Sequence, residues 1–140
     1  MSHSRILVLN NNYYKVDCDD VLETMQSYGN GADYVTESDS SYESDLDWFK
    51  NWAKDYGIEV KGKNLTIKDK SIFYDKMKEA VFEGLEDIRG NGRWKATEAL
   101  RMIHDFWIYS DNILYTLPYF LEDVKEGDTF KIRSFLDYHF

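Results

Sequence analysis

The chain has one cysteine, one proline and no long hydrophobic run among its 140 residues. The single cysteine, Cys18, excludes an internal disulfide and any zinc site built on a cysteine pair. No apolar run approaches the roughly 20 residues that a membrane helix needs, and the first residues lack the apolar segment of a signal peptide. These absences predict a protein of the cytoplasm, where thiols stay reduced, with no membrane partner.

Basic residues are missing from one whole stretch of the chain. The formal net charge is −9, and the segment from Asp17 to Phe49 holds ten acidic residues and no Lys or Arg, although the chain has 17 bases. Residues 50–78 reverse the balance, with eight lysines against four acids. We therefore expect a dipolar molecule, in which charge governs partner choice and encounter rate more than the fold.

The remaining composition is that of a folded domain. Hydrophobic residues make up 43% of the chain and aromatic residues 16%, which is enough to build a core. The length fits one domain and no linker or repeat interrupts it, so we predict a single domain over residues 1–140.

Short apolar segments bounded by turn residues predict the strands. Residues 5–9 and 13–16 flank three asparagines and predict an N-terminal hairpin, and residues 58–60 and 65–67 predict a central hairpin. From residue 129 onward apolar and polar residues alternate, which predicts a long terminal strand. Strict alternation places five apolar side chains of that strand on one face: Phe130, Ile132, Leu136, Tyr138 and Phe140.

Helical spacing accounts for the middle of the chain. A short helix begins after Asp19 or Asp20, a surface loop covers residues 32–40, and Ser40 caps a helix that ends at Gly57. Further helices are expected at 71–88 and 94–108, and residues 113–124 form either a strand or a helix broken at Pro118. The ensemble predicts an α+β fold with a small, mainly antiparallel sheet and about four helices packed on one face.

The acidic stretch is the candidate functional surface. Its regularly spaced carboxylates resemble the charge that a nucleic acid presents to a basic groove, and aromatic residues among them are typical of binding anchors. The acidic candidates are Asp33, Glu37, Asp39, Glu43, Asp45 and Asp47, and the aromatic candidates are Tyr42 and Trp48. A charge run of this kind also fits a solvated surface that has no partner.

This pattern predicts a non-enzymatic interaction protein that binds a basic protein surface. The concrete form is an inhibitor that competes with nucleic acid for a nucleic-acid-handling enzyme, similar in size and charge to small acidic phage antagonists of restriction and CRISPR nucleases. We expect no catalytic residue and no cofactor. We also expect no metal ion, because an EF-hand loop counted from Asp39 has Ser44 and Lys50 where Gly and Glu are needed for calcium. The negative net charge disfavours direct binding to nucleic acid.

Two other functions stay open. The fragment Ile58-Glu59-Val60-Lys61 resembles the Glu-x-Lys strand of PD-(D/E)xK nucleases, and that resemblance implies a Mg²⁺-binding carboxylate at Glu59 and a water-activating amine at Lys61. Residues 6–13 are similar to the opening of some phage-type HNH nucleases, without the His-Asn-His residues and cysteine pairs that follow there. The third function is a structural or assembly subunit of a phage or mobile element.

Overall fold

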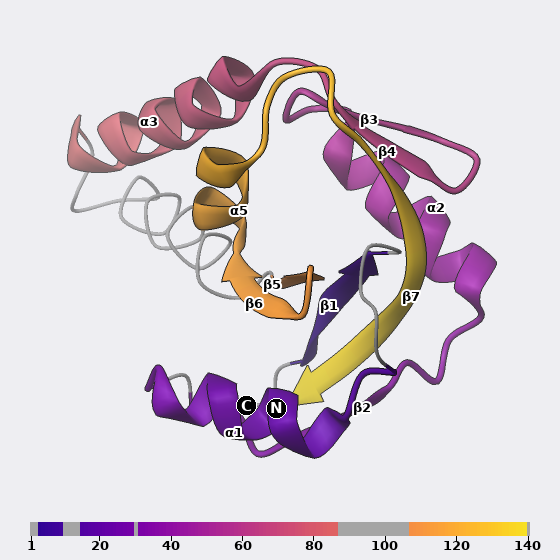
Figure 1. Ribbon diagram of the computed structural model, residues 1–140. Helices are drawn as coiled ribbons and strands as arrows, with labels where there is room; N and C mark the ends of the chain where they lie inside the picture. Colours follow the sequence, from indigo (N-terminus) through magenta and orange to yellow (C-terminus); the bar gives the residue numbers. More distant parts are fainter. Residues whose placement is uncertain (1–2, 10–14, 30, 87–106, 140) are drawn as a thin grey trace.

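The computed structural model describes residues 3–9, 15–29, 31–86 and 107–139. Four helices and seven strands lie in these ranges, which confirms the α+β class (Figure 1). The strands are β1 (His3–Leu9), β2 (Tyr34–Glu37), β3 (Ile58–Lys61), β4 (Asn64–Ile67), β5 (Trp107–Ser110), β6 (Ile113–Thr116) and β7 (Thr129–His139). The helices are α1 (Cys18–Ser27), α2 (Tyr42–Ala53), α3 (Lys70–Glu86) and α5 (Leu117–Asp123).

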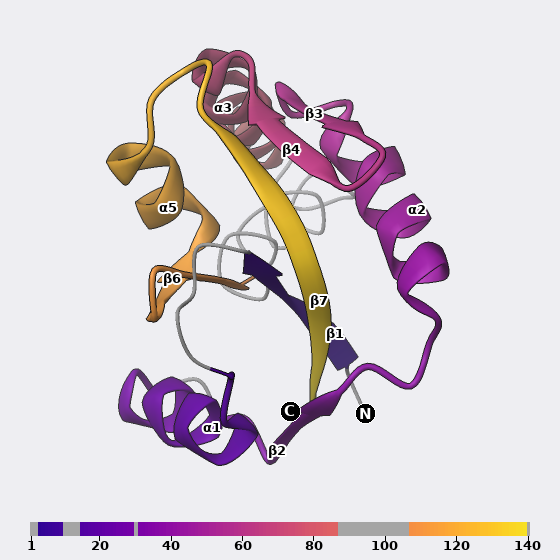
Figure 2. The same ribbon diagram turned by 45° about the vertical axis from the view of Figure 1, so that its right-hand side comes forward.

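The strands form one curled sheet with the order β3-β4-β7-β1-β5-β6, and β2 also pairs with β7. Among the described pairs, β1 and β5 run parallel and the others antiparallel, so the sheet is mainly antiparallel as the sequence predicts. The central hairpin (β3 and β4) and the terminal strand (β7) are confirmed. The long strand β7 bends through the molecule and joins the two ends of the sheet (Figures 1 and 2).

The predicted N-terminal hairpin is wrong, because β1 pairs with the far half of the chain. β7 occupies one of its edges and β5 the other. Lys15 and Val16 lie outside any strand, while Tyr13 and Tyr14 fall outside the described residues. Residues 6–9 of β1 are fully buried, as expected for a central strand that is covered on both faces.

A β-bulge in β7 changes the face that each side chain occupies. At this point β7 carries one residue more than β1, Arg133, and the pairing register shifts by one. Ile132, before the bulge, packs on the same face as Phe135, whereas Leu136 and Tyr138 pack on the opposite face. The expectation of one apolar face along the whole strand is therefore wrong.

Helices cover both faces of the sheet, not one face as the sequence suggested. One core cluster joins the sheet to α2, α3 and α5, and it includes Phe49, Phe73 and Phe120. A second cluster on the opposite face joins the sheet to α1 through Val21 and Met25. Figure 2 shows α1 and α2 on opposite sides of β1 and β7.

The helix boundaries differ from the predictions by small, explicable shifts. Asp17 caps α1 by accepting a hydrogen bond from the amide of Asp19, and Ser41, not Ser40, caps α2 through the amide of Ser44. Part of the predicted 32–40 loop is the strand β2, which pairs with β7.

The structure shows what the two remaining predicted segments, 113–124 and 94–108, form where it describes them. Residues 113–124 contain both a strand, β6, and a helix, α5, whose first turn holds Pro118, where its missing N–H costs nothing. The predicted helix at 94–108 falls outside the described residues up to position 106, and its last two residues, Trp107 and Ile108, belong to β5.

Candidate functional site

Nine of the ten acidic side chains between Asp17 and Phe49 are exposed. Five of them lie just before β2, at its end, in the loop after it and on the outer side of α2. We call these five the acidic surface: Asp33, Glu37, Asp39, Glu43 and Asp47. In Figure 1, α1 and β2 lie at the lower end of the molecule, whereas β3, β4 and α3, which belong to the lysine-rich segment, lie at the upper end. α2, which carries Glu43 and Asp47, runs beside β3 and β4, and the amine of Lys63 lies 5.4 Å from the ring centroid of Tyr42. Only the α1–β2 part of the acidic segment is therefore separated in space from the lysine-rich elements.

Helical periodicity divides the acidic residues of α2 between two sides. Glu43 and Asp47 are four residues apart, so they lie on the same side of the helix, and both are exposed. Asp45 stands midway between them in sequence and therefore points to the opposite side, where Phe49 also packs. The alternation of acids in the sequence thus does not produce one row of carboxylates.

Asp45 is a buried residue and not part of the exposed surface, contrary to its place among the candidates. Its residue exposure is 4%, and its Oδ1 accepts a hydrogen bond from Nε of Arg5 at 3.2 Å. Arg5 also donates from Nη1 to Oδ1 of Asp137 at 2.9 Å. Because Arg5 and Asp137 are direct neighbours on β1 and β7, this ion cluster ties α2 to the centre of the sheet.

Tyr42 is held against the sheet by contacts of its hydroxyl and of its ring. Its hydroxyl donates a hydrogen bond of 2.6 Å to the backbone oxygen of Ile132, and its ring packs against Phe135. Burial, and then the charge of Glu43, raises the pKa of Tyr42 above its ordinary value, so the hydroxyl stays a donor. Tyr42 is half-buried and therefore offers less surface to a partner than the sequence prediction required.

Trp48 is exposed, as the prediction of an aromatic anchor requires. It is 42% exposed and lines a hollow of about 350 Å³ between the start of β1 and the first half of α2. We call this hollow the Trp48 pocket, and its lining residues are Ser4, Arg5, Ser40, Ser44, Asp45 and Trp48.

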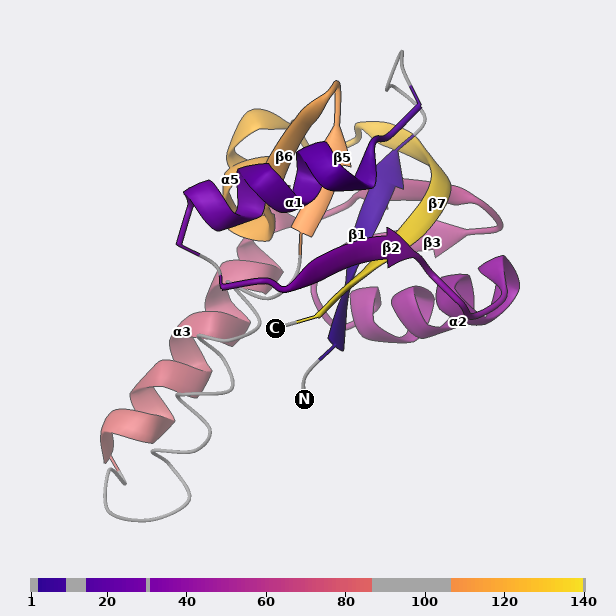
Figure 3. The same cartoon turned by 90° about the horizontal axis from the view of Figure 1, so that it is seen from below.

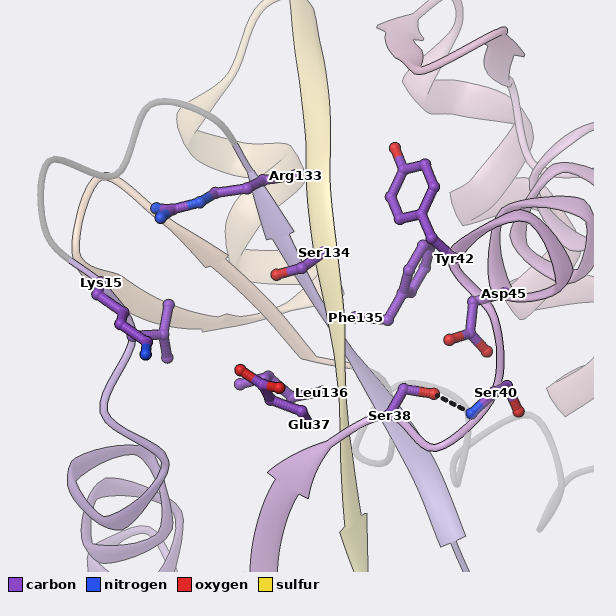
Figure 4. Close-up of a pocket in the computed structure, with 11 residues that line it drawn as sticks. Lys15, Glu37, Ser38, Ser40, Tyr42, Asp45, Arg133, Ser134, Phe135 and Leu136 are labelled. Atoms are coloured by element: carbon purple, nitrogen blue, oxygen red, sulfur yellow. Dashed lines mark hydrogen bonds between the residues drawn. The ribbon is translucent and has the colours of Figure 1, made fainter.

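A second pocket opens where the pairing of β7 is interrupted. On the edge away from β1, β4 pairs up to Lys131 and β2 begins at Leu136, and the bulge lies between them. The pocket at this break measures about 340 Å³ (Figure 4). Lys15, Arg133 and Glu37 line it together with serine hydroxyls, so it lacks a single sign of charge that would select an anion or a cation.

Asp33 is held at the start of β2 by the end of β7. Its Oδ2 lies 3.0 Å from Nδ1 of His139, and its amide donates to the backbone oxygen of the same residue at 2.6 Å. The ring of Tyr34 stacks on the buried imidazole, with ring centroids 5.0 Å apart. The Asp33 carboxylate remains largely exposed, so Asp33 belongs to the acidic surface. Figure 3 shows the strand that follows it, β2, in front of β7.

The residues of the nuclease alternative lie on the β3–β4 hairpin. The Glu59 carboxylate has the amines of Lys61 and Lys68 at 3.6 and 3.8 Å, which are surface ion pairs. The part of the chain that the structure describes contains no group of three or more His, Cys, Asp or Glu that can hold a metal ion. The nuclease alternative stays a prediction.

Sequence reasoning missed Arg5, Asp137 and His139. Asp137 and His139 lie on the polar parity of β7, which predicts exposure, and the pairing with β1 and β2 that surrounds them was not predicted. One signal was available: Arg5 directly precedes the run Ile6-Leu7-Val8-Leu9, and a base next to a fully buried run needs an acidic partner. His104, in the predicted 94–108 helix, falls outside the described residues.

The chain was compared with protein-family models, curated proteins and solved structures, and none of them matches it. Among the described helices, none is long and apolar enough to cross a membrane. The function is therefore argued from the site alone.

Proposed function

We propose that this is a non-enzymatic interaction protein of the cytoplasm whose acidic surface binds a basic protein surface. The partner is a nucleic-acid-handling enzyme, and the protein inhibits it by occupying the groove that otherwise holds nucleic acid. The observation that carries the proposal is the exposure of nine carboxylates on a base-free segment, whose elements α1 and β2 lie at the end of the molecule away from β3, β4 and α3.

Physical chemistry supports this choice over a purely solvating role. Charges of one sign that are gathered on one side of a molecule create a field that steers an oppositely charged partner, whereas mixed charges cancel it. Grooves that hold duplex DNA match about one negative charge per 1.7 Å of helix axis, so a surface with several exposed carboxylates competes for the same basic groups. A partner surface of lysines and arginines is complementary to such a surface.

The test compares two variants that remove the same charge from different places. The acidic-surface variant carries Glu37→Gln, Asp39→Asn, Glu43→Gln and Asp47→Asn. The control carries Asp55→Asn, Asp75→Asn, Glu79→Gln and Glu122→Gln, four exposed acids outside the acidic surface. Asp45 stays unchanged in both, because it is buried and bonded to Arg5. Each protein is immobilised and exposed to a lysate of the organism that encodes it.

We expect wild type and control to retain a nucleic-acid-binding protein, and the acidic-surface variant to lose it. Duplex DNA should release the retained protein. Raising the salt concentration from 0.1 to 1 M should release it too, since the Debye length falls from about 10 to about 3 Å. Equal retention by the two variants, or retention that is indifferent to salt, would contradict the proposal.

A further inference from the structure

The Trp48 pocket combines an exposed aromatic face with a buried carboxylate. Ser44 and Trp48 are four residues apart on α2, so they form one wall, and Asp45 reaches the same hollow from the side that packs on the sheet. Ser4 and Arg5 of β1 form the opposite wall. At about 350 Å³, the hollow is large enough for one long side chain.

The charge beneath this pocket is negative. Asp45 and Asp137 both contact the guanidinium of Arg5, so these three side chains together carry one net negative charge when both carboxylates are ionised. Both carboxylates are buried, and screening by water is weak there, so this charge acts more strongly on a nearby cation than an exposed carboxylate does. The exposed acids Asp47, Glu43 and Asp39 of the same segment add to this potential.

The residue types in the wall favour a guanidinium over an ammonium ion. A guanidinium is planar, stacks on an indole face and is weakly hydrated, whereas an ammonium ion is compact and strongly hydrated. The hydroxyls of Ser40 and Ser44 supply acceptors for its remaining N–H groups. We propose that the Trp48 pocket receives an arginine side chain of the partner, an inference that rests on the proposed function.

The pocket beside the β7 bulge is a weaker site for the same cation. Lys15 and Arg133 line that pocket and repel a guanidinium, and the two acids that also line it, Glu37 and Asp45, only balance their charge. The Trp48 pocket has one cation, Arg5, and this cation is already bound to two carboxylates. Charge complementarity therefore assigns the arginine to the Trp48 pocket.

The test uses two peptides of equal length and charge as probes, a tetra-arginine and a tetra-lysine peptide, both with blocked ends. Each is titrated into the ¹⁵N-labelled full chain at low salt, and the indole N–H signal of Trp48 and the amide signal of Ser44 are followed by NMR. We expect the arginine peptide to shift both signals and to bind about tenfold more tightly than the lysine peptide, as a desolvated cation–π contact of this kind implies.

Two substitutions of Trp48 separate the contribution of the indole to peptide binding from that of the surrounding charge. Trp48→Leu should remove the preference for arginine and leave the weaker, charge-driven binding of both peptides, while Trp48→Phe should keep part of the preference. Tyr119→Leu, at an exposed aromatic residue on α5, is the matched control and should behave as wild type. A preference that survives Trp48→Leu, or equal binding of the two peptides to wild type, overturns the inference.

The acidic-surface variant distinguishes this result from a failure of the proposed function. If it loses both peptides while wild type shows no preference for arginine, the acidic surface binds cations and the arginine pocket is refuted. If it binds both peptides as wild type does, the proposed function fails. If it binds both more weakly and still prefers arginine at Trp48, both proposals are supported.

Discussion

Replacing Arg5 by methionine tests the ion cluster that joins α2 to the sheet. Arg5 donates to Asp45 at 3.2 Å and to Asp137 at 2.9 Å, and the carboxylate side chains are 6% and 11% exposed. Methionine keeps much of the apolar stem of Arg5 and removes its charge. The substitution therefore leaves two buried carboxylates close together without their shared cation.

The expected loss of stability follows from the cost of an unpaired buried charge. Removing one partner of a buried ion pair costs about 3–5 kcal/mol. The Arg5 side chain is 22% exposed, so water screens part of this cost and we expect about 3 kcal/mol. With a urea m value of about 2 kcal/mol/M, the unfolding midpoint falls by about 1.5 M. Against a total stability of about 5–15 kcal/mol, this is a large change.

Urea unfolding followed by circular dichroism measures the effect. The matched control is Arg133→Met, an exposed arginine on β7, for which we expect a change within about 0.5 kcal/mol. The triple variant Arg5→Met, Asp45→Asn, Asp137→Asn should recover most of the loss, because both carboxylate charges that Arg5 contacts are then gone. An Arg5→Met loss below about 1 kcal/mol, or a triple variant no more stable than the single one, would refute the reasoning.

Three further predictions concern single residues. Gly57→Ala should lower the free energy of unfolding, measured by thermal unfolding, by at least about 2 kcal/mol, because Gly57 has a φ of +76° and a Cβ there meets the backbone oxygen of Asp69. A loss below about 1 kcal/mol would contradict this prediction. Tyr42→Phe should cost about 1–2 kcal/mol in urea unfolding, because it removes the hydrogen bond to the backbone oxygen of Ile132, and an unchanged midpoint would show that water replaces it. Burial, and then nearby acids, raises the pKa of Cys18, so less thiolate is present at a given pH, and its alkylation by iodoacetamide at pH 8 should be slower than that of a free cysteine peptide. The midpoint of its pH–rate profile should lie above that of the peptide, and a midpoint at or below it would be the contrary result.

Local signals predicted the elements that local interactions form. The β3–β4 hairpin follows from two alternating segments around Gly62, whose φ of +56° suits the turn. The helices α1, α2 and α3 follow from capping residues and apolar spacing, and their boundaries were predicted to within a few residues. Each of these signals lies within about 18 residues of chain, so a single sequence contains it in full.

Long-range pairing explains what the sequence did not reveal. The partners of β1 are β5 and β7, and no short segment encodes that choice. The Ile6–Leu9 run was nevertheless informative, since four consecutive buried apolar residues fit a central strand better than a hairpin with one solvated face. The bulge at Arg133 left a fainter mark, because only Ser134 and Phe135 interrupt the alternation of apolar and polar residues along β7.

The acidic segment shows why charge must be counted by face and not by sequence. Glu43, Asp45 and Asp47 alternate in the chain, yet the helix exposes the first and third and buries the second beside Arg5. Neutralising all three together would combine a loss of surface charge with a loss of the contact that holds α2 to the sheet. Lost binding in such a variant would say nothing about the surface, because an unfolded protein also fails to bind. Variants that spare Asp45 separate the two effects, and only their binding data can support or refute an acidic interaction surface.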